Sequence, residues 1–478
     1  MEPDDEPNSI IENNKATYRI LSGGARVAAG NLIVIVAGAA FWIVVGLLLG
    51  PEIVGVSSSV LSAATIASVL GGLSLSISIL RLYMEYGKGS IIVALAFSIL
   101  GTMLVALLVA SLASNLLGGE LREYSKWILM LAVALSTARL GQASLVACGC
   151  ERFYTIVVGV GQVLRLGVGL VLGYMIGVKG VLVGLLLGPL TIALLGVSRG
   201  ISSSRTPMRF PSLKGALEVV RVGVSNYPFM ISTQVMVPLT VIFTAYMTGT
   251  AVDTGVFYIM LNIILAIGMP MYSVATVGIP RSVELMDNTS LWSVGRVVLA
   301  LILPLTAVTM SSPDLILSFF GPEYVMGSSA LTVLALSIPA QAGLILGVSY
   351  LNVIKGYARV LSSGIAFLVV LPAASLMLEY YSGGVYSPVT LIAVSYVVAS
   401  YMGLLATLLR GIVVFVLKAL LVTVIAGMAG ILVSILVNSL LGVVVSFSTS
   451  IILVEILGLS TIGDMREAVK IIVLSVFK

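Results

Sequence analysis

The sequence has 478 residues, of which 59% are hydrophobic and 9% charged, with a formal net charge of +5. A soluble domain carries about 25% charged residues, so this chain lacks the polar surface that a water-soluble fold of its size requires. The composition therefore indicates a membrane protein. The excess of positive charge is better explained by membrane topology than by nucleic-acid binding.

Apolar runs follow one another from Ala25 nearly to the end of the chain, separated by Gly, Pro and charged residues. Runs of about 20 residues are long enough to cross the hydrocarbon core of a bilayer. The sequence thus predicts an all-α polytopic membrane protein of about fourteen transmembrane helices. We place them at 25–49, 54–80, 90–112, 127–147, 153–177, 180–198, 219–244, 254–278, 293–311, 326–350, 358–378, 389–409, 413–436 and 439–458.

Charge distribution sets the expected orientation. The first 22 residues are acidic and polar, without the short apolar core of a cleavable signal peptide, so the first span is expected to act as its own insertion signal. With a cytoplasmic N-terminus and fourteen spans, twenty Lys and Arg residues fall inside and only Arg122, Lys126 and Lys179 fall outside. This bias predicts a multi-pass protein of the plasma membrane with both termini in the cytoplasm.

Weak internal repeats suggest two halves of six spans each. "RVAAGN" (26–31) returns as "RVGVSN" (221–226), and a Gly-Pro-Glu turn precedes both the second and the tenth expected span. Repeated bundles are common in transporters. The expected parts are a cytoplasmic N-terminal segment (1–22), an N-lobe (23–198), a basic cytoplasmic linker (199–218), a C-lobe (219–410), and two final spans followed by a short cytoplasmic helix (411–478).

Two arginines lie deep inside expected spans. Ser136, Arg139 and Gln142 are spaced by three and are expected to form one polar stripe on a helix, and Gln162, Arg165 and Gly169 are expected to form a similar one. Intramembrane charges are costly and usually face a cavity. Because no acidic residue is available nearby, an anionic ligand or water is the expected partner. The structural alternative is that the side chains reach the headgroups or pair with glutamine and backbone carbonyls.

Arg26 and Arg221 begin the first and seventh expected spans. Each is either a topology anchor or a cation at the cytoplasmic mouth of a cavity. Asn31 and Asn226, five residues on, lie about 140° around the helix from the arginine. We therefore expect the asparagines to pack between helices through hydrogen bonds.

Further polar residues of the second half are candidates for a supporting role. Gln234 and Asn262 accompany Asn226 there, and Pro228, Pro238 and Pro270 lie nearby. Proline in a membrane helix frees backbone carbonyls and permits bending. A structural kink is the alternative reading of this region.

Other chemistry has little support in the sequence. The chain has no histidine, and its two cysteines, Cys148 and Cys150, cannot complete a four-ligand zinc site. Glu455 is the only carboxylate well inside an expected span. We expect no metal, no cofactor and no enzymatic activity, since a membrane glycosyltransferase or ligase generally needs acidic or histidine residues and a sizeable loop domain.

The stretch 25–89 with its Leu-Gly-Pro-Glu turn, "FFGPEYVMGSSALTVLALSIP" (319–339) and "LGLSTIGDMREAVKIIV" (457–473) resemble the Wzx-type polysaccharide flippases. These belong to the multidrug/oligosaccharidyl-lipid/polysaccharide (MOP) exporter superfamily. The resemblance implies two six-helix lobes around a central cavity and transport by alternating access. It also implies a polyprenyl-(pyro)phosphate-linked glycan as cargo, and proteins of glycan assembly as partners besides the bilayer.

The resemblance also gives the arginines a role, because related flippases hold lipid phosphates with cavity arginines. Arg26 and Arg221 fit by position, and Arg139 and Arg165 by chemistry only. The expected function is flipping of a lipid-linked oligosaccharide from the cytoplasmic to the outer leaflet. The alternative is multidrug efflux within the same superfamily, which the near-absence of intramembrane acids disfavours for cationic drugs.

Overall fold

The computed structural model describes residues 15–49, 51–116, 123–202, 211–234, 251–285, 289–319, 322–382 and 387–477. Over these residues the regular structure is helical, without a strand. The predicted all-α class is therefore confirmed. Such a structure satisfies every backbone group within each segment, as the bilayer requires.

Contacts divide the chain into two compact units. We call Ala25–Val235 together with Ile279–Glu284 the N-terminal unit, and Met1–Gly24, Met236–Gly278 and Leu285–Lys478 the C-terminal unit. Two helices belong to both units: α1 (Lys15–Leu49) and α11 (Ala251–Leu285). The predicted lobe boundaries at 199–218 and 410 stay predictions, and residues 203–210 of the expected linker lie outside the described residues.

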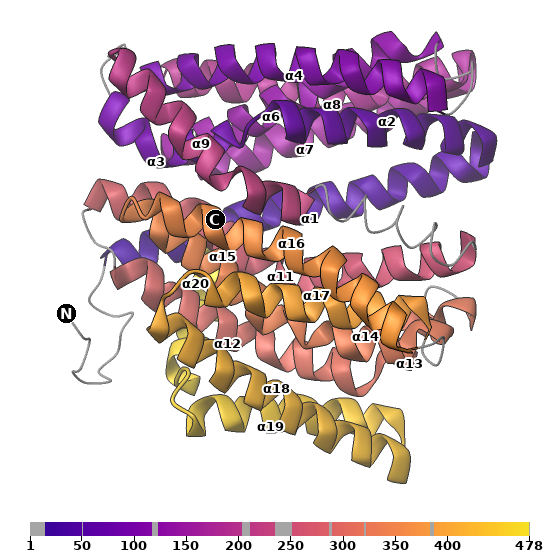
Figure 1. Ribbon diagram of the computed structural model, residues 1–478, viewed down its shortest axis with the longest axis vertical. Coiled ribbons are helices and arrows are strands. Elements are labelled where there is room, and N and C mark those ends of the chain that lie inside the picture. The colour runs from indigo at the N-terminus through magenta and orange to yellow at the C-terminus, as the bar shows by residue number, and fades with distance from the viewer. Residues whose placement is uncertain are drawn as a thin grey trace. The chain divides into compact units, whose positions relative to one another are not determined.

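The remaining helices of the N-terminal unit are α2 (Pro51–Gly71), α3 (Leu75–Tyr86), α4 (Lys88–Leu116), α6 (Ser125–Ala147), α7 (Glu151–Ile176), α8 (Val178–Ser202) and α9 (Leu213–Gln234). In Figure 1 the long helices α2, α4, α6 and α8 run beside one another from left to right, and they are in contact with one another.

The C-terminal unit continues with α12 (Thr289–Ser311), α13 (Pro313–Ser318), the 3₁₀ helix η1 (Pro322–Gly327), α14 (Ser328–Ala335), α15 (Ser337–Val353), α16 (Tyr357–Ser382), α17 (Pro388–Leu405), α18 (Arg410–Leu436), α19 (Ser439–Ile456) and α20 (Ile462–Phe477). The last of these is the short helix expected after the final span. Arg296 and Lys418 donate to the carbonyls of Gly458 and Leu457, at 3.0 and 3.2 Å, where α19 ends. Cations are favourable at this negative end of a helix.

Ten of the described helices are long and apolar enough to cross a membrane, and two bent pairs raise the number to twelve. The pairs are Val60–Gly71 with Leu75–Tyr86, bent by 42°, and Tyr324–Ala335 with Ser337–Val353, bent by 44°. Both correspond to the expected spans that follow Gly-Pro-Glu. The other two of the fourteen expected spans coincide with α17 and with α9, whose expected range continues past the described residues at Gln234.

Glycine allows helices of the N-terminal unit to approach to backbone contact. A Cβ added to Gly184 on α8 would collide with the backbone of Gly169 on α7. One added to Gly71 on α2 would collide with the backbone of Thr102 on α4. Close approach through small residues is how membrane helices gain packing energy, since hydrophobic burial offers little between helices in lipid.

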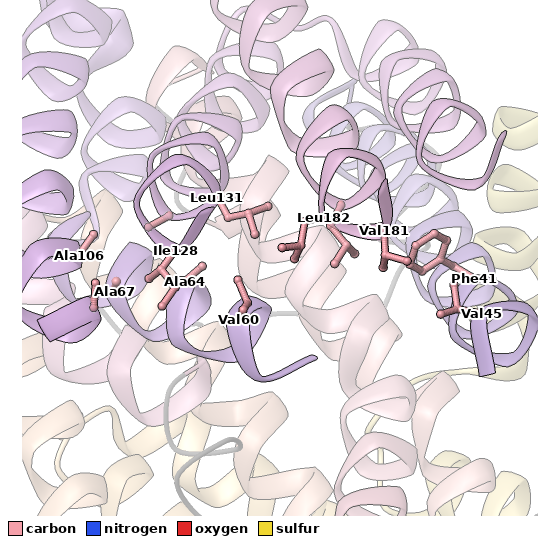
Figure 2. Packing of buried hydrophobic residues seen from close by; sticks show 13 residues of the cluster. Phe41, Val45, Val60, Ala64, Ala67, Ala106, Ile128, Leu131, Val181 and Leu182 are labelled. Carbon is pink, nitrogen blue, oxygen red and sulfur yellow. The ribbon is translucent and has the colours of Figure 1, made fainter. Parts of the chain in front are cut away.

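A hydrophobic core holds α1, α2, α4, α6 and α8 together (Figure 2). Its members are fully or almost fully buried and come from helices far apart in the sequence. They are Phe41, Val45, Val60, Ala64, Ala67, Ala106, Ala110, Ile128, Leu131, Ala132, Val181, Leu182 and Leu185. Alanines on α2, α4 and α6 let these helices approach closely, and the larger side chains of the core fill the remaining space between the helices.

The two cysteines lie in the tight turn between α6 and α7. Cys150 donates its N–H to the carbonyl of Leu145 at 2.8 Å, and Gly149, with a φ of 78°, donates to Val146 at 3.0 Å. This pair of bonds is a Schellman motif, which satisfies the last carbonyls of α6. Both cysteines are free, and no cluster of potential metal ligands occurs among the described residues.

Candidate functional site

Arg165 lies near the middle of α7 and faces α1. Its guanidinium carbon is 4.7 Å from the ring centroid of Phe41, close enough for a cation–π contact. Gly38, one turn before Phe41, lies next to the guanidinium, since a Cβ built there would be in ordinary van der Waals contact with Nη1 of Arg165, at 3.8 Å. Within the part of the chain that the structure describes, Nε of Arg165 has no hydrogen-bond partner.

Gln162 adds a second polar group on the same face of α7. Its side chain is buried, and Oε1 accepts no hydrogen bond from the described residues. Residues three apart share a helix face, so the amide and Arg165 form the expected polar stripe. An unsatisfied acceptor and donor together inside the bilayer are costly, and a ligand or water that satisfies them is favoured.

Arg139 belongs to a different part of the N-terminal unit. It lines a pocket at the break between α2 and α3, together with residues of α4, α6 and α9. Ser136, one turn before it, shares a 2.6 Å hydrogen bond with Ser98 of α4. Gln142 is half-buried on α6 one turn further along. The predicted polar stripe of α6 thus borders a cavity at Ser136 and Arg139.

The first copy of the repeated motif (26–31) lies on α1 and is hydrogen-bonded to the start of α7. The hydroxyl of Tyr154 donates to Oδ1 of Asn31 at 2.7 Å, and the hydroxyl of Thr155 donates to the backbone carbonyl of Arg26 at 2.9 Å. Asn31 therefore packs between helices, as its position suggested. The side chain of Arg26 is half-buried.

The second copy lies on α9. Asn226 is fully buried and its amide donates to the carbonyl of Val222 in the same helix at 2.8 Å. Arg221 is exposed, and its carbonyl accepts from Ser225 at 2.8 Å. By contacts both copies belong to the N-terminal unit, since this unit extends to Val235.

The other supporting residues are more dispersed. Gln234 is half-buried at the end of the described part of α9, and Asn262 is exposed on the part of α11 that belongs to the C-terminal unit. Pro228 lies inside α9 and Pro270 inside α11, whereas Pro238 lies outside the described residues. The structure thus brings Arg165 and Gln162 together on one face, and places Arg139 at a separate cavity.

One cluster was not anticipated from the sequence. Arg281 makes ion pairs with Glu151 at 2.5 Å and with Glu284 at 2.6 Å. The Arg281 and Glu151 side chains are only 6% and 8% exposed. In the fourteen-span topology Arg281 is one of the twenty expected cytoplasmic cations. The sequence pattern that could have indicated this cluster has two parts. Arg281 and Glu284 lie three residues apart at the end of one helix, and Glu151 is an acid at the start of another.

Charge in the N-terminal unit is distributed unevenly. Its described carboxylates lie at or near helix ends: Glu85, Glu123, Glu151, Glu218 and Glu284. The charged residues farther from the helix ends are all arginines: Arg26, Arg81, Arg139, Arg165 and Arg221. The described interior of this unit therefore has a cationic character, and it has no carboxylate at mid-helix for a cationic ligand or a coupling cation.

No family model matches the sequence, and no curated protein matches it significantly. Solved structures are similar over most of its length. The chain superposes on a MOP superfamily transporter from Pyrococcus furiosus with a TM-score of 0.67 at 17% identity, covering 85% of this chain and 98% of that one. The description of that structure states that its binding pocket has reverse polarity, which suggests a different function for that transporter.

Two further structures give the same result. An outward-facing multidrug resistance MATE family transporter of the MOP superfamily has a TM-score of 0.66 at 17% identity, covering 85% of this chain and 98% of that one. The bent form of the Vibrio cholerae MATE transporter VcmN has a TM-score of 0.63 at 14% identity, with coverage of 86% and 99%. The chain has the MATE fold.

The MATE fold agrees with the predicted architecture of helices in two lobes. Two of these structures are described as MOP superfamily transporters, and the sequence resembles members of that superfamily. The narrower Wzx flippase assignment stays a prediction, as do the substrate roles of the candidate residues. The many apolar helices and the MATE fold together indicate a multi-pass membrane protein.

Proposed function

We propose that the protein is a membrane transporter that exports an amphiphilic organic anion by alternating access. The MATE fold supports a transporter, and one of its structural neighbours is described as a multidrug resistance transporter. Multidrug efflux is the alternative function in the sequence analysis, and the present proposal narrows its substrates to organic anions. The proposal assigns no chemical conversion and no cofactor.

The anionic character of the substrate rests on Arg165. Its charge lies at mid-helix against the ring of Phe41, and its Nε has no hydrogen-bond partner among the described residues. The described mid-helix residues of its unit include no acid. A guanidinium recognises phosphate, sulfonate and carboxylate through paired N–H donors. The Phe41 ring provides an apolar surface beside the charge, which suits an amphiphile.

A second candidate is flipping of a lipid-(pyro)phosphate-linked oligosaccharide from the cytoplasmic to the outer leaflet of the plasma membrane. The cationic mid-helix positions favour it, because this cargo also joins a phosphate to an apolar chain. The sequence resemblance to Wzx-type flippases favours it as well. In this case Arg26 and Arg221 would meet the phosphate first, and glycan-assembly proteins would be partners.

Reconstitution into liposomes tests both candidates. One arm measures transport of a fluorescent alkyl phosphate, a second that of the cation ethidium, and a third the flipping of a labelled polyprenyl-pyrophosphate oligosaccharide. Transport of the alkyl phosphate supports the first proposal, and flipping of the glycolipid alone replaces it with the second. Transport of ethidium alone, or of none of the three, overturns both.

Arg165→Gln identifies the role of the guanidinium in the same assay. The matched control is Arg199→Gln, which removes another arginine whose guanidinium lies over a ring, 5.9 Å from Phe153, but in the last turn of α8. We expect R165Q to lose at least tenfold in transport rate, a factor worth about 1.4 kcal/mol. R199Q should retain the wild-type rate. Equal rates in wild type and R165Q would remove Arg165 from the site.

A further inference from the structure

The break between α2 and α3 forms a small polar cavity that the export of an organic substrate does not explain. Leu73 and Ser74 have φ of 48° and 54°, in the left-handed region that non-glycine residues rarely adopt. The two helix segments are bent by 42°. Non-helical backbone at membrane depth is tolerated where it is covered by protein or lines a cavity.

The cavity is lined by five serines and one arginine. Its polar lining residues are Ser68, Ser74, Ser76, Ser98, Ser136 and Arg139, and no acidic residue is among the described residues that line it. The remaining walls are Gly72 and the apolar residues of α2, α3, α6 and α9. A site with one positive charge, hydroxyl donors and no carboxylate favours an anion over a cation.

Ser74 supplies the observation that points to a ligand. Its side chain is only 7% exposed, and its Oγ has no hydrogen-bond partner within the described chain. It precedes α3 but makes no capping bond with its side chain. A buried hydroxyl that bonds neither to its own helix nor to a neighbour costs about 1–3 kcal/mol unless something else accepts or donates.

A second hydroxyl donor comes from Ser98 and Ser136, which also line the cavity. Ser98 and Ser136 share one hydrogen bond of 2.6 Å, so one of the two hydroxyl protons is used and the other remains for a ligand. Ser68 donates to the carbonyl of Thr65 at 2.8 Å and is therefore occupied as a donor. The cavity thus offers at least two hydroxyl donors in addition to the charge of Arg139.

Gly72 keeps the cavity open. A Cβ added there would lie 2.7 Å from the carbonyl oxygen of Ser68, 3.1 Å from Oγ of Ser136 and 3.6 Å from Oγ of Ser98. The cavity volume is about 20 Å³, slightly more than the ~10–15 Å³ that a single water-sized particle needs. Pockets for organic ligands occupy about 300–1,000 Å³, so this space admits only a small inorganic ion.

We propose that the cavity between α2, α3, α4, α6 and α9 binds one small monovalent anion of the size of chloride. The anion accepts hydrogen bonds from Ser74 and from the Ser98–Ser136 pair, in the cavity that Arg139 also lines. It stabilises the broken second span. The inference concerns this ion alone and holds or fails independently of which organic substrate is exported.

Thermal unfolding of the purified protein in detergent provides the test. Chloride is exchanged for gluconate, an anion too large for the cavity, at constant ionic strength and without organic substrate. We expect the Tm to rise with chloride in a saturable manner, because a ligand that binds only the folded state stabilises it. A Tm that does not distinguish chloride from gluconate overturns the proposal.

Two variants and a matched control locate the effect. Gly72→Ala fills the cavity and should abolish the chloride dependence, and Ser74→Ala should weaken the apparent chloride affinity about tenfold, the effect of one lost hydrogen bond to a charge. The control is Ser57→Ala, which removes another buried, unpartnered hydroxyl from α2 outside the cavity. It should keep the wild-type dependence. If the Tm of S74A depends on chloride as that of the wild type does, the proposed site is wrong. This result is decisive even if G72A does not fold.

Discussion

Arg281, near the end of α11, lies 2.5 Å from the carboxylate of Glu151, the first residue of α7. The pair is buried, and Glu284 adds a second carboxylate at 2.6 Å. By contacts α11 belongs to the C-terminal unit as far as Gly278 and to the N-terminal unit from Ile279 to Glu284. The ion pair therefore fastens the end of a helix shared by both units to α7.

Removing one partner of this pair should destabilise the protein strongly. In Glu151→Gln the guanidinium keeps only the more exposed Glu284 as an ionic partner. Breaking a buried pair from one side typically costs about 3–5 kcal/mol, because the remaining charge stays buried. Thermal unfolding in detergent should therefore show a large fall in Tm.

Glu123→Gln is the control for this measurement. Glu123 pairs with Lys179 at 2.7 Å, and both side chains are more than half exposed. Exposed ion pairs contribute about 0–1 kcal/mol, so the Tm of E123Q should stay close to that of the wild type. Equal losses in E151Q and E123Q would contradict a special role for the Arg281–Glu151 pair.

The all-helical class and the positions of most spans could be predicted from the sequence, because length and hydropathy alone decide whether a segment crosses a bilayer. The bend at Leu73 and Ser74 could not. Both residues adopt a positive φ although neither is a glycine, the residue that usually marks such a conformation, and Gly71 and Gly72 immediately precede them. The energy that holds them there comes from packing against α4, α6 and α9.

The candidate site was predicted in part. The stripe of Gln162 and Arg165 follows directly from helical periodicity, so it was accessible from the sequence. The ring of Phe41 beside Arg165 and the pairing of Arg281 with Glu151 join helices distant in sequence. Only the tertiary arrangement determines such partners, and a single sequence has no signal for them.

Backbone contact between α7 and α8 makes a specific glycine indispensable. In Gly184→Ala the new methyl group would overlap Cα of Gly169 and the carbonyl of Arg165, which are backbone atoms that cannot move alone. Overpacking of this kind typically costs about 1–3 kcal/mol. We expect a lower Tm and, because α7 has to shift, an impaired Arg165 site.

Gly167→Ala is the matched control on α7 itself. A Cβ there would meet nothing within 4 Å, and alanine is the better helix former. Its Tm should equal or exceed that of the wild type. A fall in G167A as large as that in G184A would show that the loss reflects any added methyl group and not the contact between α7 and α8.

The two cysteines should differ in reactivity. Burial raises the pKa of the Cys148 thiol to about 12, whereas Cys150 is partly exposed in the turn between α6 and α7. The thiolate is the reactive form, so Cys148 is almost entirely unreactive at neutral pH and its reactivity should rise with pH up to about 12. Mass spectrometry after maleimide treatment at pH 7 should therefore find label on Cys150 alone. Labelling of Cys148 at a similar rate would contradict its burial.

The turn that contains Cys150 can be used to test the membrane orientation predicted from the distribution of Lys and Arg. The turn between α6 and α7 is expected on the cytoplasmic side, since Arg152 and most other cations fall on that side in the fourteen-span topology. A Cys148→Ala variant leaves Cys150 as the only thiol. A membrane-impermeant maleimide should then label inside-out vesicles and leave intact cells unlabelled. Intact cells that label as readily as inside-out vesicles would place this turn outside and invert the topology, and Arg26 and Arg221 would then lie at the outer mouth of the transport pathway.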